Sequence, residues 1–147
     1  MKKTFFASLV SFAIILFTLS LVKAQSNLKT ASGPMAKWGI SKNNKVIDGD
    51  THDFGNIPAG TPVSVDFVVT NTGTAPLILS SVQASCGCTT PEWTKEPIPP
   101  GKSGKIKATY NAAAVGPFNK GITVISNSVD QPTKVLYIKG EVKMQGQ

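Results

Sequence analysis

The sequence lacks arginine, and its 147 residues include one histidine, two cysteines and only 16% charged side chains. All fifteen cations are therefore lysines. A nucleic-acid surface usually gathers its basic side chains and includes arginine for bidentate contacts, so we expect no nucleic-acid partner. Few side chains remain for catalysis or metal binding, and the sequence predicts no enzyme and no cofactor. The length leaves room for one domain.

The first 24 residues have the pattern of a secretory signal peptide: lysines at the start, then an apolar stretch over residues 5–22. Val22 and Ala24 suit the −3 and −1 positions of a cleavage site, so cleavage is expected between Ala24 and Gln25. Cleavage would remove three lysines and lower the net charge from +7 to +4. An uncleaved anchor helix is the alternative, because the apolar stretch is near the lower length limit for a span. We expect an exported protein, periplasmic or extracellular, with no membrane association after cleavage.

The mature chain divides at about residue 50. Residues 25–49 are expected to form a polar linker and an irregular lead-in. Within it, residues 38–40 and 45–47 flank a polar tetrapeptide, an arrangement that also fits a short hairpin. The domain is expected at residues 50–143, followed by a tail at residues 144–147.

From residue 50 onward, apolar and polar side chains alternate with the period of a half-buried strand, and no window shows a sustained helical period. Six or seven short strands start about ten residues apart, a spacing typical of sandwiches. Sheets this short must bury an apolar face against a second sheet. The predicted fold is all-β: an immunoglobulin-like β-sandwich of about seven antiparallel strands. The expected core includes Val65, Phe67, Leu79, Ile106, Ile122 and Ile138.

Five segments in order carry a family resemblance: residues 52–60 (HDFGNIPAG), 69–77 (VTNTGTAPL), 84–93 (ASCGCTTPEW), 98–104 (IPPGKSG) and 138–142 (IKGEV). Together they resemble the bacterial secreted family catalogued as domain of unknown function 1573. That family is similar in turn to immunoglobulin-like domains of the Hydin and major-sperm-protein type. The resemblance implies a seven-stranded sandwich and an exported protein. It implies no established activity.

Cys86-Gly87-Cys88 is the segment with candidate chemistry. On an extended strand the two Cα atoms would lie about 7 Å apart, which is at the edge of disulfide reach. Gly87 permits a bend that brings the sulfurs together. Three interpretations stay open: a structural role at a tight turn, a redox-active disulfide, or a thiolate pair for Cu(I) or zinc. Zinc prefers four ligands and the chain adds only His52, so we predict no metal site and favour the structural role.

Three other motifs give weaker signals. His52-Asp53 is not evidence of a catalytic triad, because a triad is recognised by geometry. Residues 101–103 resemble the end of a phosphate-binding loop, but Glu96 stands where the first glycine is required. Trp93 could anchor a partner or cap an open end of the sandwich.

The expected function is that of an exported, non-enzymatic β-sandwich module. It would bind a protein or glycan partner of the cell envelope, or support the envelope. The alternative is a periplasmic thiol-redox or copper-handling protein that uses Cys86 and Cys88. A hydrolase would need paired carboxylates or a nucleophile with a base, which the scattered acids and single histidine do not offer.

Overall fold

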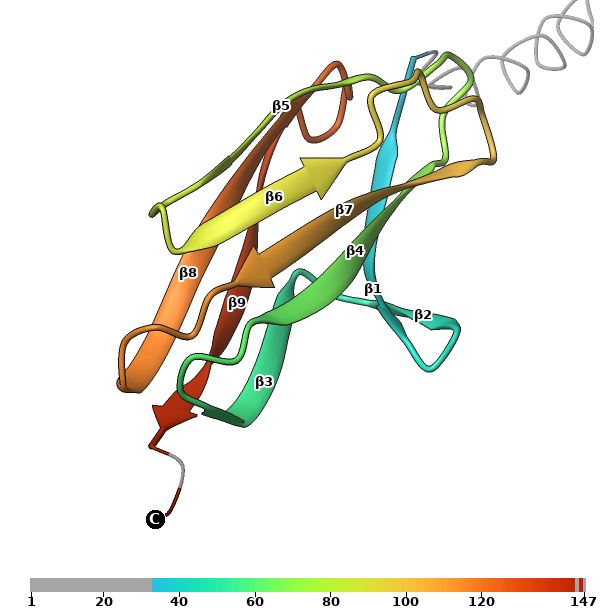
Figure 1. Cartoon of the computed structure of the whole chain (residues 1–147). Helices are drawn as coiled ribbons and strands as arrows, with labels where there is room; N and C mark the ends of the chain where they lie inside the picture. The colour runs from blue at the N-terminus through green and yellow to red at the C-terminus, as the bar shows by residue number, and fades with distance from the viewer. Residues whose placement is uncertain (1–32, 145, 147) are drawn as a thin grey trace, which may run out of the picture. The chain divides into compact units, whose positions relative to one another are not determined.

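The computed structural model describes residues 33–144 and residue 146 (Figure 1). This part of the chain forms nine strands: β1 (Ala36–Lys42), β2 (Lys45–Asp48), β3 (Thr51–Pro58), β4 (Val63–Asn71), β5 (Leu79–Ala84), β6 (Thr89–Trp93), β7 (Ser103–Tyr110), β8 (Gly116–Ser126) and β9 (Thr133–Lys143). None of the described residues belongs to a helix long and apolar enough to cross a membrane. The predicted signal peptide and the Ala24–Gln25 cleavage site lie outside the described residues.

The strands form two sheets, one of five strands in the order β2-β1-β4-β7-β6 and one of four in the order β3-β9-β8-β5. The predicted all-β, immunoglobulin-like sandwich is confirmed. The predicted domain at residues 50–143 contains seven strands, β3 to β9, as expected, and β1 and β2 precede it. One detail of the prediction is wrong, because β3 pairs parallel to β9. Alternation of apolar and polar side chains is the same for a parallel and an antiparallel neighbour, so the pattern could not distinguish them.

The segment before residue 50 also differs from the irregular lead-in that we expected. β1 pairs antiparallel with β4 and extends the five-stranded sheet, and β2 folds back on β1 as a hairpin. Asn43 and Asn44 form the two-residue turn with φ of 50° and 59°, as a type I′ turn requires. The hairpin alternative is therefore correct, and the hairpin spans residues 36–48. Burial of the Trp38 and Ile40 side chains holds it on the sandwich.

The core lies between the two sheets. All six predicted core residues are buried, and four of them (Phe67, Ile106, Ile122 and Ile138) have no exposed surface. This confirms the choice of inward-facing positions on β4, β5, β7, β8 and β9.

Asn71, in the second resemblance segment, is a buried polar residue that joins two connections between strands. Its side-chain amide donates hydrogen bonds to the carbonyl oxygens of Ala75 (2.8 Å) and Ile98 (2.9 Å). Its side-chain oxygen accepts a hydrogen bond from the Gly73 N–H at 3.0 Å. Asn71 and Gly73 of this segment therefore hold the β4–β5 connection, and Asn71 also joins it to the β6–β7 connection.

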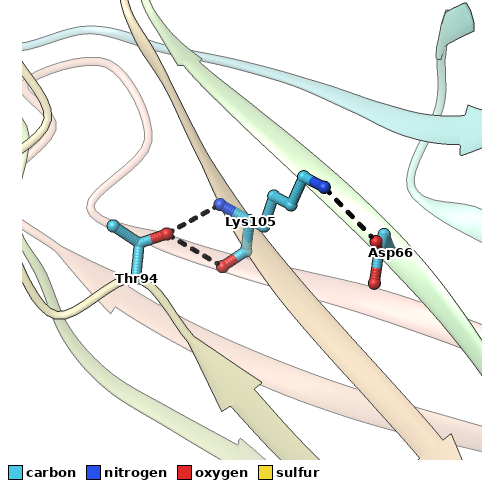
Figure 2. Close-up of polar contacts among 3 residues, drawn as sticks. All are labelled: Asp66, Thr94 and Lys105. Atoms are coloured by element: carbon cyan, nitrogen blue, oxygen red, sulfur yellow. Dashed lines mark hydrogen bonds and ion pairs between the residues drawn. The ribbon is translucent and has the colours of Figure 1, made fainter. Parts of the chain in front are cut away.

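Polar side chains pair with one another across β4, β7 and the end of β6 on the outer face of the five-stranded sheet, as Figure 2 shows for Asp66, Thr94 and Lys105. The Lys105 N–H on β7 donates to the Thr94 hydroxyl at 2.9 Å, and the Lys105 ammonium lies 3.7 Å from Asp66 on β4. Two further cross-strand hydroxyl pairs, each at 2.8 Å, lie on the same face: Ser64–Thr109 and Thr70–Ser103. These side chains satisfy one another across neighbouring strands.

Candidate functional site

The Cys86-Gly87-Cys88 segment forms the turn that leaves β5, at the edge of the four-stranded sheet, and enters β6, at the edge of the five-stranded sheet. In Figure 1 this turn is the yellow-green bend at the left that leads into the start of β6. The two cysteines are joined in a disulfide, with their Cα atoms 5.2 Å apart. The extended spacing of about 7 Å does not apply, because the chain bends at Gly87 instead of continuing as a strand.

Backbone hydrogen bonds hold this turn as well as the disulfide does. Ser85 N–H donates to the Gly121 carbonyl at 2.9 Å, and Thr89 N–H donates to the Cys86 carbonyl at 3.4 Å. The Cys88 carbonyl accepts a hydrogen bond of 3.0 Å from the N–H of Asn111 in the β7–β8 connection. The turn is therefore tied to β8 and to the end of β7 without the sulfur–sulfur bond.

The turn is open to solvent at Gly87. Gly87 is exposed, both cysteines are partly exposed, and a Cβ built on Gly87 would meet no heavy atom within 4 Å. Cys88 packs against the hydrophobic core, whereas Cys86 is not among the side chains that do so. The Cys86 sulfur lies 3.9 Å from the hydroxyl of Thr89.

The structure does not bring His52 to the cysteines. His52 lies on β3 and the cysteines follow β5, and these strands are at opposite edges of the four-stranded sheet. Among the described residues, no three His, Cys, Asp or Glu side chains are grouped so that they could hold a metal ion.

His52 and Asp53 have separate surroundings. The His52 ring packs edge-on against Phe54 with 4.5 Å between ring centroids, and its burial, helped by the charge of Lys42, lowers its pKa. Asp53 instead accepts a hydrogen bond of 2.8 Å from Gly55 N–H, which lowers the pKa of its carboxyl, and it lies 3.5 Å from the Lys139 ammonium. Neither arrangement is that of a catalytic base with an orienting acid.

Residues 101–103 and Trp93 also have structural surroundings. Gly101 has a φ of 75°, and its N–H donates to the Asn71 carbonyl at 2.8 Å, while the Lys102 carbonyl accepts from Asn71 N–H at 2.9 Å. Trp93 is partly buried against the core, with the Lys95 ammonium 2.8 Å from its ring centroid. The tryptophan is therefore a packed residue with a cation over its exposed side.

Two surfaces were not predicted from the sequence. The first is an open cleft of about 360 Å³ beside Trp38. It is lined by two ion pairs, Lys37–Asp48 at 3.1 Å and Lys134–Asp50 at 2.9 Å. The hydrogen bond from Lys134 lowers the pKa of Asp50. Three separate segments supply these side chains, so no local motif marks the cleft.

The second surface is an uncharged strip on the outer face of the four-stranded sheet. We call it the outer strip; it consists of Gly121, Thr123 and Ile125 on β8 and Val135 and Tyr137 on β9. Ile125 is 45% exposed and Tyr137 is 40% exposed. A Cβ on Gly121 would lie 3.4 Å from Val135 and 3.7 Å from Tyr137, so both side chains lean over the glycine. All four residues from Val135 to Ile138 are apolar or aromatic. The sequence pattern therefore does not show which of them face outward.

A family model described as "Protein of unknown function (DUF1573)" matches residues 46–142, about two thirds of the chain. The chain belongs to this family. The fold is of the immunoglobulin-like type, which an ASH/PapD-like domain shares. No curated protein is a significant match.

Solved structures share the fold of this DUF1573 protein at low sequence identity. A protein of unknown function from Porphyromonas gingivalis W83 has a TM-score of 0.62 at 20% identity; the match covers 80% of the present chain and 51% of that one. The ASH/PapD-like domain 7 of human CEP192 has a TM-score of 0.56 at 11% identity, with 74% and 86% covered. The VesB protease of Vibrio cholerae has a TM-score of 0.55 at 14% identity, with 86% and 35% covered. The chain thus spans about half of the Porphyromonas protein.

Proposed function

We propose that this DUF1573 protein is an exported, non-enzymatic module that binds a protein partner of the cell envelope through the outer strip. The observation that carries the proposal is the group of uncharged side chains exposed together on β8 and β9. Ile125 and Tyr137 are exposed in the strip, and the ion pair of Lys139 with Asp53 lies beyond Tyr137 at one end of it. Exposed aromatic and aliphatic side chains grouped in this way are typical of interaction surfaces.

The chemistry of the strip favours a protein over a glycan. A glycan is bound by several hydrogen-bonding side chains around an aromatic ring, and the strip offers only the hydroxyls of Thr123 and Tyr137. Its remaining members are glycine and aliphatic residues. The expected partner therefore presents an apolar, uncharged surface to Ile125, Val135 and Tyr137.

The motifs of the chain support a module without catalysis. Asn71 and Gly101 serve connections between strands, Asp53 binds the backbone of Gly55, and His52 packs on Phe54. The fold also occurs as part of longer chains: the match covers 35% of VesB and 27% of a Clostridium perfringens family 123 glycoside hydrolase. A sandwich that works beside other domains or partners is consistent with both observations.

Photo-crosslinking in cells that export the protein tests the proposal. A photoreactive residue replaces Thr123 in the strip or, as a matched control, exposed Thr90 on β6. We expect a discrete protein adduct from position 123 and none from position 90. Ile125→Glu should abolish the adduct, and Val115→Glu, at a 58% exposed position outside the strip, should leave it unchanged.

Three results would overturn the proposal. These are equal adducts at both positions, no adduct at position 123, or an adduct that survives Ile125→Glu. An adduct that carries glycan instead of protein would replace the protein partner by a carbohydrate. Circular dichroism of each variant shows whether the sandwich is intact.

A further inference from the structure

The disulfide of the β5–β6 turn closes a loop with one intervening residue, Gly87. A cross-link stabilises a protein chiefly by restricting the unfolded chain, and this effect is small for so short a loop. The hydrogen bonds of Ser85, Thr89 and Asn111 hold the turn on their own. Stability of the sandwich therefore does not explain why two cysteines stand here.

The turn is open on the Gly87 side, and both cysteines are partly exposed. No side chain stands over Gly87, and no charged residue occurs in the sequence between Asp66 and Glu92. Another protein could therefore approach the turn without meeting a charge from this segment. Structural disulfides resist reduction, whereas exposed ones are the labile and reactive class.

The two cysteines are not equivalent. Cys88 packs against the hydrophobic core, so its sulfur lies on the inner side of the turn. Cys86 has the Thr89 hydroxyl beside its sulfur and no such packing. An incoming thiolate would therefore reach the Cys86 sulfur first.

We propose that Cys86–Cys88 is a thiol–disulfide exchange site for a dithiol protein of the thioredoxin type in the oxidising compartment to which the chain is exported. A thiolate of the partner attacks the Cys86 sulfur and forms a mixed disulfide. The Cys86–Cys88 bond breaks, and its electron pair goes to the Cys88 sulfur, which takes up a proton.

The partner's second thiolate then attacks its own sulfur in the mixed disulfide and releases Cys86, which is protonated. In balance, the partner dithiol is oxidised to a disulfide, and the Cys86–Cys88 bond accepts two electrons and two protons. The reverse reaction with an oxidised partner restores the bond. This site is independent of the outer strip, which lies on β8 and β9.

The first test asks whether the bond exchanges in the folded protein. The exported protein, purified with its disulfide formed, is treated with dithiothreitol without denaturant while thiols are counted and tryptophan fluorescence is followed. We expect two thiols to appear with unchanged fluorescence, and glutathione disulfide to remove them again. Thiols that appear only in denaturant, or a loss of fold on reduction, would show a structural bond and overturn the proposal.

The second test compares the two cysteines. Cys88→Ala leaves Cys86 free, and Cys86→Ala leaves Cys88 free. The first variant should react with glutathione disulfide roughly tenfold faster than the second, because access controls thiol reactivity. Thr90→Cys in a chain without Cys86 and Cys88 gives the rate of an ordinary exposed thiol. Equal rates, or a faster Cys88, would contradict the assigned order of attack.

The third test uses a defined partner, a thioredoxin variant that lacks its resolving cysteine. Such a variant retains the mixed disulfide because the second attack cannot occur. We expect it to be trapped on the wild-type protein, with mass spectrometry of peptides locating the link at Cys86. A link at Cys88 or no link after native incubation would overturn the proposal, and neither outcome depends on binding at the outer strip.

Discussion

Asn71 has no exposed surface, yet its side chain makes three hydrogen bonds to the backbone of two connections. Asn71→Ala would leave the carbonyl of Ala75 and the N–H of Gly73 without these partners, while the Ile98 carbonyl would keep the Leu77 N–H as its donor. We expect the free energy of unfolding to fall by about 3 kcal/mol, because each buried polar group left unpaired costs about 1–3 kcal/mol. Urea unfolding followed by tryptophan fluorescence measures the loss.

Exposed Thr72, the next residue along the chain, supplies the control for Asn71. Thr72→Ala should change the unfolding free energy by no more than about 0.5 kcal/mol, the usual range for a surface substitution. If Asn71→Ala also stayed within that range, the hydrogen bonds of Asn71 would not be what joins the two connections.

At the same scale, apolar positions were easier to predict than polar ones. Ile106, between Lys105 and Lys107, is marked as core by its alternation with polar neighbours, and it is fully buried. Asn71 has no comparable mark, since a polar residue before a glycine is equally typical of an exposed turn. Its burial depends on carbonyls that come from residues 75 and 98, and no local pattern contains them.

Among the elements, the β5–β6 turn gives a test of what the disulfide contributes. The Cys86→Ala, Cys88→Ala double variant should stay folded and lose less than about 2 kcal/mol of unfolding free energy. A disulfide that encloses only Gly87 lowers the entropy of the unfolded chain very little, so it adds little stability. Three backbone hydrogen bonds also keep the turn in place without it. Calorimetry and urea unfolding measure the difference.

Wild-type protein unfolded in the presence of reductant is the control for the double variant, because it loses the bond but keeps both sulfur atoms in place. Its loss should be no greater than that of the double variant. A large loss only in the double variant would point to the packing of Cys88, and a large loss in both would mean that the cross-link holds β5 to β6.

A segment of the sequence becomes a strand only where a neighbouring strand pairs with it. Trp38 and Ile40 form an apolar pair in the sequence, but their burial requires that β1 pair with the edge of β4. Residues 25–49 alternate too little between apolar and polar side chains to predict that pairing. For Cys86 and Cys88 the sequence allows either an extended strand or a bend at Gly87. The chain bends there, where it passes from one sheet to the other. Alternation identifies a strand, and tertiary pairing decides where it ends.

For the molecule as a whole, the sandwich could be predicted but its surfaces could not. The spacing of strands and the five resemblance segments were sufficient for the fold class. The Trp38 cleft and the outer strip each combine segments that only the sheet order brings together, such as Asp50 with Lys134 and Gly121 with Tyr137. The same applies to His52, whose distance from the cysteines follows from β3 and β5 lying at opposite sheet edges.

The extent of the mature molecule is the last prediction. A positively charged start, an apolar stretch and a small residue at Ala24 predict that the exported chain begins at Gln25, with that glutamine able to cyclise. Intact-mass spectrometry should therefore show a protein without residues 1–24, and its net charge should be +4 where the full sequence has +7. Ala24→Lys should block cleavage, since the −1 position requires a small side chain, and the uncleaved product should then sediment with membranes. A wild-type mass that includes residues 1–24 would show instead that the apolar stretch is retained as an anchor.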